Sequence, residues 1–109
     1  MKILLVLAAI LGFAAVLNVR ASDAKANYDS LCAKCHGEDG KGQTKMGQKL
    51  GVKDLTDAKV QADLKDDAAA KVIKEGKKDA DGKTQMKAFD TLSDDEVKAL
   101  IAYVRAFKK

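Results

Sequence analysis

The sequence predicts an all-α fold. Three observations support it: apolar residues recur at three- and four-residue spacings, helix-capping side chains stand where these patterns begin, and no run alternates between apolar and polar residues for the length of a strand. The chain has 109 residues, which limits it to a single domain.

The first 21 residues are predicted to be a signal peptide that is not part of this domain. A basic start is followed by an apolar run over residues 3–17 and then by small residues, which is the order found in secretory signals. We expect cleavage after Ala21, or alternatively after Ala26. The mature domain would be residues 22–109, exported to the periplasm. An uncleaved N-terminal anchor is the alternative, although the apolar run is short for a membrane span.

The first helix of the domain is predicted over residues 22–35. Ser22 or Asp23 can cap its start, and the chain is expected to leave it at Gly37. Four residues at i, i+3, i+4 and i+7 share one face of this helix: Tyr28, Leu31, Cys32 and Cys35.

A Cys-x-x-Cys-His motif stands at the end of this helix. Both cysteines of the chain, Cys32 and Cys35, and its one histidine, His36, lie within five residues. Two thiols at this spacing can each add to a vinyl group of a porphyrin, and the adjacent histidine can bind the iron through a ring nitrogen. The motif therefore predicts one covalently attached haem c, with iron.

Three other interpretations of the motif explain less of it. A thiol–disulfide redox centre is expected in a strand–helix setting and leaves His36 without a role. A structural zinc site needs four ligands of the cysteine or histidine type, and the motif offers three. A disulfide between Cys32 and Cys35 would close a very small loop and constrain the unfolded chain little.

Glycines are frequent between Gly37 and Leu55, which predicts a loop region with turns. Backbone without a Cβ can pass close to a flat ligand, so we expect this region to approach the haem. Three of its apolar residues are candidates for lining the haem pocket or for ordinary core packing: Leu50, Val52 and Leu55.

The next stretch is predicted to form two short helices or one broken helix. Asp57 is the expected N-cap of the first piece, and the second opens at Asp66 or Asp67 and stops at Gly76. Residues 77–84 are polar and are predicted to be an exposed loop. Three apolar residues of the second piece are expected to face inward: Ala69, Val72 and Ile73.

The last helix has the clearest signals. Ser93 and Glu96 form a capping box, and Leu92 and Val97 form the matching hydrophobic staple. Arg105 suits the negative end of the helix dipole. A continuous apolar stripe follows the cap: Val97, Leu100, Ile101, Val104 and Phe107.

The second axial ligand of the iron separates electron transfer from ligand chemistry. No second histidine is present, and the expected mature chain has two methionines, Met46 and Met86. A thioether ligand favours Fe(II) and raises the reduction potential. We favour Met86, because it lies 50 residues after His36 and the chain can reach the opposite haem face. Met46 lies only ten residues after His36 and is expected in a pocket wall or at the surface.

Three stretches make the chain resemble a small class I cytochrome c of bacterial type. They are C-A-K-C-H-G-E-D-G-K-G at 32–42, D-G-K-T-Q-M-K-A-F at 81–89 and L-S-D-D-E-V-K-A-L-I-A-Y-V-R at 92–105. The resemblance covers nearly all of the expected mature chain. It implies a cytochrome c fold, in which the N- and C-terminal helices cross near the haem. It also implies that Cys32 and Cys35 form the thioether bonds to the haem. His36 would then be the proximal ligand of the iron and Met86 the distal ligand.

Two features depart from that family. Proline often follows the ligand methionine, whereas Lys87 follows Met86 here. The family also commonly has a proline after the haem motif, whose carbonyl accepts the histidine ring N–H, and this chain contains no proline. Another carbonyl, within residues 47–55, must then accept the N–H of His36, or the ring is held more loosely.

The sequence therefore predicts an electron carrier that docks briefly with redox partner proteins. With both axial positions filled it would need no substrate pocket and would not be an enzyme. A haem catalyst or gas sensor is the alternative if Met86 is not on the iron. A subunit tethered to a respiratory complex by an uncleaved anchor is another.

Charge and composition bear on the partners. Nucleic acid is not expected, because the chain has no block of like charge and only five aromatic side chains. Membrane contact is expected only through partners or through an uncleaved anchor. Five lysines near the motifs would either rim an exposed haem edge and steer acidic partners, or simply be solvated: Lys34, Lys45, Lys49, Lys83 and Lys87.

Overall fold

The computed structural model describes residues 21–109, which form six helices and one two-stranded hairpin. In chain order the elements are α1 Ala21–Leu31, α2 Ala33–His36, α3 Lys45–Leu50, α4 Ala58–Asp63, α5 Asp66–Glu75, β1 Lys77–Lys78, β2 Thr84–Met86 and α6 Asp94–Arg105. Residues 1–20, and with them nearly all of the predicted signal peptide, lie outside the described residues, so the division at Ala21 stays a prediction. No helix within residues 21–109 is long and apolar enough to cross a membrane.

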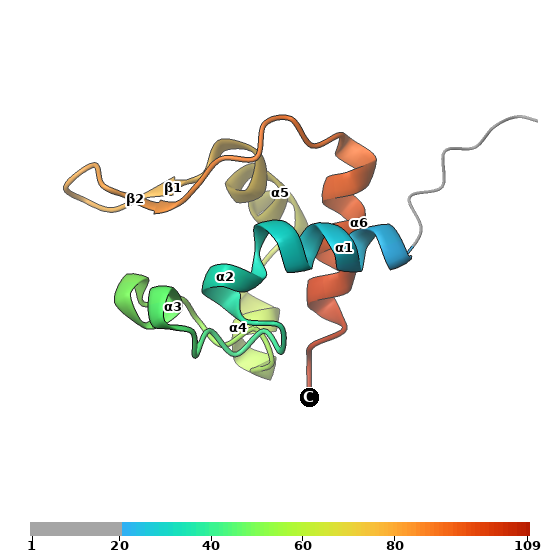
Figure 1. Cartoon of the computed structure of the whole chain (residues 1–109), viewed down its shortest axis with the longest axis horizontal. Helices are drawn as coiled ribbons and strands as arrows, with labels where there is room; N and C mark the ends of the chain where they lie inside the picture. Colours follow the sequence, from blue (N-terminus) through green and yellow to red (C-terminus); the bar gives the residue numbers. More distant parts are fainter. Residues whose placement is uncertain (1–20) are drawn as a thin grey trace, which may run out of the picture.

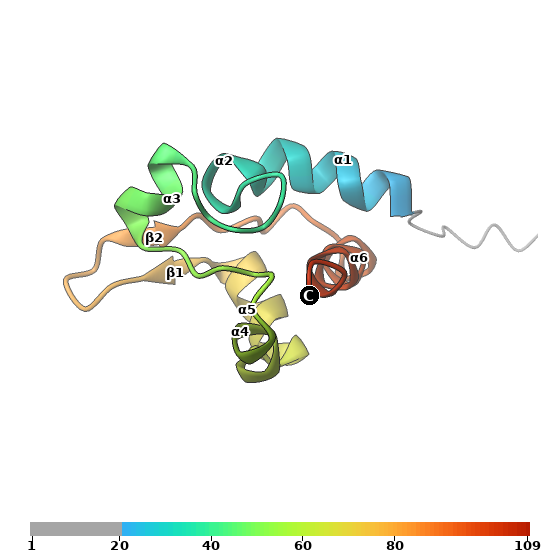
Figure 2. The same cartoon turned by 90° about the horizontal axis from the view of Figure 1, so that it is seen from below.

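The first and last helices of the described chain cross each other, as the resemblance implied (Figure 1). Figure 2 shows α6 end-on with α1 lying beside it. At the crossing the ring of Tyr28 in α1 packs 5.0 Å from the ring of Tyr103 and 5.2 Å from that of Phe107, measured between centroids. Tyr28, Leu100 and Val97 are the largest fully buried side chains, so the core is centred on this crossing.

Helix α6 begins as the capping box predicts. The hydroxyl of Ser93 accepts a hydrogen bond from the Glu96 N–H, and the Glu96 carboxylate accepts one from the Ser93 N–H, both at 3.1 Å. Leu92 and Val97 are both buried in the core, as expected of a staple. The predicted apolar stripe is confirmed, except that Phe107 lies beyond the last helical residue.

Helices α4 and α5 confirm the expected pair. Asp57 caps α4 by accepting hydrogen bonds from the N–H groups of Lys59 and Val60. Helix α5 begins at Asp66 and is followed by Gly76. Of the three residues expected to face inward, Ala69 is buried, and Val72 and Ile73 are half-buried.

The predicted single helix over residues 22–35 is two helices, because the chain turns at Cys32. The carbonyl of Cys32 accepts hydrogen bonds from the N–H groups of Cys35 and His36, which starts a new helical turn. Leu31 is the last residue of α1 and is 37% exposed.

A helix, α3, occupies part of the region predicted to be loop. Thr44 is its N-cap and accepts a hydrogen bond from the Gly47 N–H at 2.9 Å, and Gly51 ends it in the left-handed conformation. Two of the glycines that suggested a loop therefore belong to this helix: Gly47 is buried within it, and Gly51 is its C-cap.

The predicted exposed loop at residues 77–84 is largely a β-hairpin, in which Lys77 pairs with Met86. The side chain of Asp79 organises its tip by accepting hydrogen bonds from the N–H groups of Asp81 and Lys83, each at 2.9 Å. The strands have only two and three residues, which is too short for an alternating pattern to show. In Figures 1 and 2 the hairpin and α3 lie at the same end of the domain, the end away from α6.

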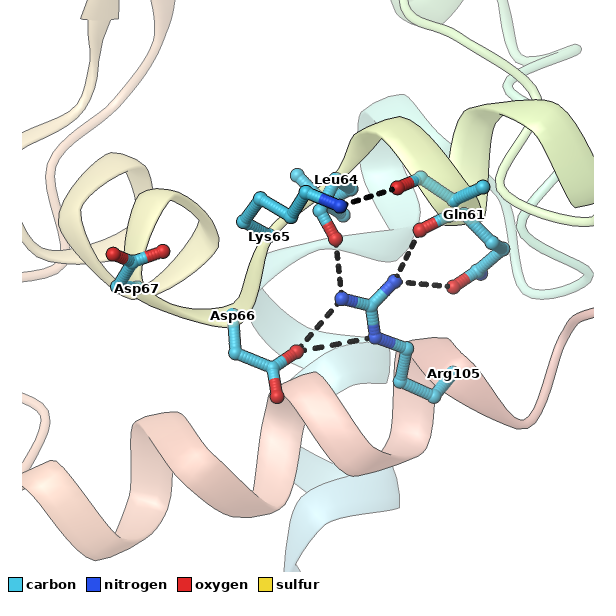
Figure 3. A pocket seen from close by; sticks show the side chains of 7 residues that line it. Gln61, Leu64, Lys65, Asp66, Asp67 and Arg105 are labelled. Carbon is cyan, nitrogen blue, oxygen red and sulfur yellow. Dashed lines mark hydrogen bonds and ion pairs between the residues drawn. The ribbon is translucent and has the colours of Figure 1, made fainter.

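Arg105 of α6 connects three helices, a role that the sequence pattern did not predict. Its guanidinium donates to the main-chain oxygen of Gln61 at 2.6 Å, to the side-chain oxygen of Gln61 at 3.0 Å, and to the carbonyl of Leu64. It also pairs with Asp66 at 2.7 Å (Figure 3). Helix α6 is thereby fixed to the end of α4 and the start of α5.

Candidate haem site

The Cys-x-x-Cys-His motif occupies a single turn of helix. Cys32 is the N-cap of α2, and Cys35 and His36 are its last two residues. Gly37 ends the helix at a φ of 81°. Residues three and four positions apart on a helix are neighbours on its surface, so the two thiols and the imidazole are presented together.

Two side chains and one glycine hold the backbone of this turn. The Tyr28 hydroxyl donates to the Gly37 carbonyl at 2.7 Å, and the Thr44 hydroxyl donates to the Cys35 carbonyl at 2.9 Å. Helix α3 packs against α2 at Gly47, where a Cβ would lie 2.1 Å from the Cys35 oxygen. No larger residue fits at Gly47 without moving one helix from the other.

The imidazole of His36 has the properties of a metal ligand. Burial lowers its pKa below the ordinary value, so the ring is neutral at pH 7 and has a free lone pair. Its Nδ1 atom is buried and has no hydrogen-bond partner among residues 21–109. A histidine with a purely structural role is expected to hydrogen-bond its buried nitrogens, so burial alone does not account for this ring.

The carbonyl expected to accept the ring N–H of His36 stays a prediction. A neutral imidazole has its N–H on one nitrogen and its lone pair on the other, so Nδ1 cannot serve both as the iron ligand and as the N–H donor. In the structure no carbonyl of residues 47–55 is hydrogen-bonded to Nδ1.

The two thiols do not resemble a thiol–disulfide redox centre. Cys32 and Cys35 are half-buried, and no disulfide joins them. Burial, with a smaller effect from Cys35, raises the pKa of Cys32 to about 11. Redox-active pairs need a thiol whose pKa is lowered, so that the thiolate forms at neutral pH. The strand–helix setting expected of such a centre is also missing from residues 21–109.

Both candidate distal ligands are half-buried and come from different elements. Met86 is the last residue of β2, and Met46 lies in α3 next to Gly47. Met86 therefore arrives on a separate hairpin, whereas Met46 belongs to the helix that packs on the motif itself. Of the four predicted site residues, the fold gathers Cys32, Cys35 and His36 on one turn, and the role of Met86 stays a prediction.

The apolar candidates for pocket lining differ in burial. Leu50 and Val52 are half-buried, and Leu55 is buried outside the main core cluster. The Leu55 N–H donates to the Gly40 carbonyl at 2.8 Å, which draws the two ends of the glycine-rich region together. The burial of these three residues fits a wall of the haem pocket, and their role there stays a prediction.

Comparisons with known proteins identify the family of this chain. A family model described as cytochrome c oxidase, cbb3-type, subunit III matches residues 19–104. The chain belongs to this family of c-type cytochromes. A solved structure, KustC0563 c-type cytochrome, is 37% identical to this one with a TM-score of 0.68, and the match covers 79% of this chain and 98% of that chain. No curated protein matches the chain.

Membership confirms two predictions. This c-type cytochrome has the cytochrome c fold, and it binds haem c covalently, with iron, for electron transfer. The residues of the motif fit that group: two thiols for the two thioether bonds and a neutral, buried imidazole for the iron.

Proposed function

We propose that this c-type cytochrome is an exported one-electron carrier, attached to haem through Cys32 and Cys35, with the iron bound by His36 and Met86. The setting of His36 carries the proposal, because its buried Nδ1 atom has no partner among the described residues while the ring sits one helical turn from Cys32. When bound, the haem supplies an Fe(III)/Fe(II) couple that takes up and releases one electron.

The arrangement of the elements favours Met86 over Met46 as the distal ligand. Helix α3, which carries Met46, packs against the α2 turn that carries His36. A ligand on the opposite haem face needs a segment that approaches from elsewhere. The hairpin with Met86 provides one, because the chain that follows it is hydrogen-bonded to α5, from the Phe89 N–H to the Ile73 carbonyl.

With His36 and Met86 both on the iron, no coordination position is left for a substrate. This is the reason to propose a carrier and not an enzyme or gas sensor. A soft thioether stabilises Fe(II), so the reduction potential should be higher than with a second nitrogen ligand.

The spectrum of the oxidised protein tests this ligand pair. The wild type should show the weak sulfur-to-iron charge-transfer band at about 695 nm. Met86→Leu should lose the band, and Met46→Leu, the matched control, should keep it. Loss of the band in Met46→Leu but not in Met86→Leu would make Met46 the distal ligand. A high-spin wild type that binds carbon monoxide would favour the haem catalyst or gas sensor with an open site.

Export and attachment can be measured on the same sample. A pyridine haemochrome spectrum counts the haems, and an intact mass shows whether they are covalent and where the N-terminus begins. A mature chain starting at Ser22 or Asn27 supports a free periplasmic carrier. A chain that keeps residue 1 supports the tethered subunit, a possibility that the family description also raises.

The proposed partners are redox proteins with acidic docking surfaces. The five lysines near the motifs are all exposed, and they belong to three different elements and their flanks. If they steer association, the rate of electron transfer with an acidic partner should fall steeply as ionic strength rises. A rate that ignores salt would assign them to the solvated surface.

A further inference from the structure

We infer that Gly76 is a positioning residue for Met86: the missing side chain at Gly76 lets the backbone of residues 86–88 lie against the end of α5. The position of the Met86 sulfur follows from that contact. The inference rests on the proposed function, in which Met86 binds the iron.

The contact at Gly76 involves only main-chain atoms. A Cβ added there would lie 2.6 Å from the Met86 oxygen, 2.9 Å from the Ala88 nitrogen and 3.2 Å from the Lys87 carbonyl carbon. Real Cβ atoms do not come within 3.0 Å of such atoms, as this one would for the Met86 oxygen and the Ala88 nitrogen, and no change of rotamer could move backbone atoms away. A side chain at Gly76 must therefore push the Met86 segment away from α5.

Strand pairing at Met86 and one hydrogen bond beyond it fix the same segment. Lys77 of β1 and Met86 of β2 are partners across the hairpin. Three residues after Met86, the Phe89 N–H donates to the Ile73 carbonyl of α5 at 2.8 Å. The last carbonyls of a helix have no partner within the helix, so the Met86 segment satisfies a group that α5 leaves open.

Helix α5 is in turn a fixed reference. Ala69 is buried in the core cluster, and Asp66 is held by Arg105 of α6. The position of Met86 is thus linked through Gly76 and α5 to the packed centre of the domain. Because α5 is held in place at Ala69 and Asp66, a side chain at Gly76 should displace the Met86 segment and not the helix.

Gly82 offers a matched control in the same hairpin. Gly76 and Gly82 both have a positive φ, 78° and 80°, so an alanine is strained at either position. A Cβ at Gly82 has no atom within 4 Å, in contrast to the three backbone atoms that surround one at Gly76. Gly82→Ala therefore imposes the backbone strain without displacing Met86.

The test compares the haem-loaded wild type with Gly76→Ala, Gly82→Ala and Met86→Leu. We expect the wild type and Gly82→Ala to keep the sulfur-to-iron band, and Gly76→Ala to lose most of it. Added imidazole, which competes with the Met86 sulfur for the iron, should bind the ferric Gly76→Ala protein roughly tenfold or more tightly than Gly82→Ala. In a Met86→Leu background, Gly76→Ala should leave the affinity for imidazole unchanged.

The outcomes separate this inference from the proposed function. Suppose that Met86→Leu removes the band, whereas Gly76→Ala keeps it and binds imidazole with the same affinity as Gly82→Ala. That result would overturn the role of Gly76 and leave Met86 as the ligand. A wild type without the band overturns the ligand assignment and the inference with it.

Hydrogen exchange tests the same idea if Gly76→Ala fails to mature. In the reduced wild-type protein the Phe89 amide should exchange as slowly as the Gly76 amide, which donates to the Val72 carbonyl at 2.8 Å within α5. Fast exchange of the Phe89 amide beside slow exchange at Gly76 would show that the segment opens independently of α5, which contradicts the inference.

Discussion

The hydroxyl of Tyr28 donates a hydrogen bond to the carbonyl oxygen of Gly37 at 2.7 Å. Tyr28 is fully buried, and its ring packs on Tyr103 and Phe107 at the crossing of α1 and α6. Gly37 ends the helix that carries the haem motif. One side chain therefore connects the centre of the core to the backbone that positions His36.

Tyr28→Phe should weaken this connection without emptying the core. The ring is kept, but the Gly37 carbonyl loses one of its two donors, the other being the Gly40 N–H at 3.1 Å. The free energy of unfolding should therefore fall by about 0.5–1.5 kcal/mol, the usual net value of one hydrogen bond. Guanidinium unfolding of the haem-loaded protein measures the change. Tyr103→Phe is the control, because its hydroxyl makes no hydrogen bond with residues 21–109. An equal loss in both variants would show that the Tyr28 hydroxyl has no special role.

The buried side chain of Gln61 connects α4 to α6 and to the segment that precedes α4. Its amide donates to the Leu55 carbonyl at 2.5 Å and to the Val104 carbonyl at 2.9 Å, and its oxygen accepts from Arg105. Gln61→Leu keeps the volume but leaves the Leu55 carbonyl without this donor, so stability should fall by about 1–3 kcal/mol.

The control for Gln61 is Lys65→Ala, because Lys65 is exposed and lines the same surface pocket as Gln61 and Arg105 (Figure 3). Substitutions of this kind change stability by less than about 0.5 kcal/mol. Denaturant unfolding of both variants checks the contrast, and a Gln61→Leu protein as stable as Lys65→Ala would show that its hydrogen bonds contribute nothing net.

Local sequence rules predicted the elements that local interactions determine. The capping box at Ser93 and Glu96, the N-cap at Asp57 and the stop at Gly76 each follow from residues close together in the chain. The Cys-x-x-Cys-His motif belongs to the same class, since its geometry needs only one helical turn.

The features that were missed depend on distant parts of the chain. Helix α3 is stabilised where Gly47 meets the Cys35 carbonyl, and the hairpin is held where α5 meets Met86. No periodic pattern records such contacts. Two local signals were nevertheless available: Thr44 and Gly51 bracket α3 as caps, and the Asp81-Gly82 pair is a common hairpin turn.

The stability of the capping box should depend on pH. Hydrogen bonds from Ser93, with a smaller effect from Asn27, hold the pKa of Glu96 below its ordinary value. A carboxyl with a lowered pKa in the folded state contributes stability that is full above its unfolded pKa and is lost as the pH falls through the folded pKa. The loss should therefore occur below about pH 5.

Glu96→Gln isolates that contribution, because glutamine can still accept the Ser93 N–H bond but does not titrate. Between about pH 5 and pH 3 the wild type should lose more stability than Glu96→Gln does, with little difference between them at pH 7. Asp95→Asn, an exposed acid in the same first turn, is the control. Parallel pH profiles for the wild type and Glu96→Gln would contradict the assignment.

Removal of the haem should abolish cooperative folding. The fully buried side chains of appreciable size are Tyr28, Leu100 and Val97, which is a small core for a domain of this length. Haem adds a large apolar surface and two covalent connections at Cys32 and Cys35, so the chain made without haem should lack much of the burial that stabilises the native state. Circular dichroism during heating of the haem-free chain should show a gradual change and no sigmoidal transition. A sigmoidal transition with native helix content would show that the crossing of α1 and α6 is sufficient to fold the domain.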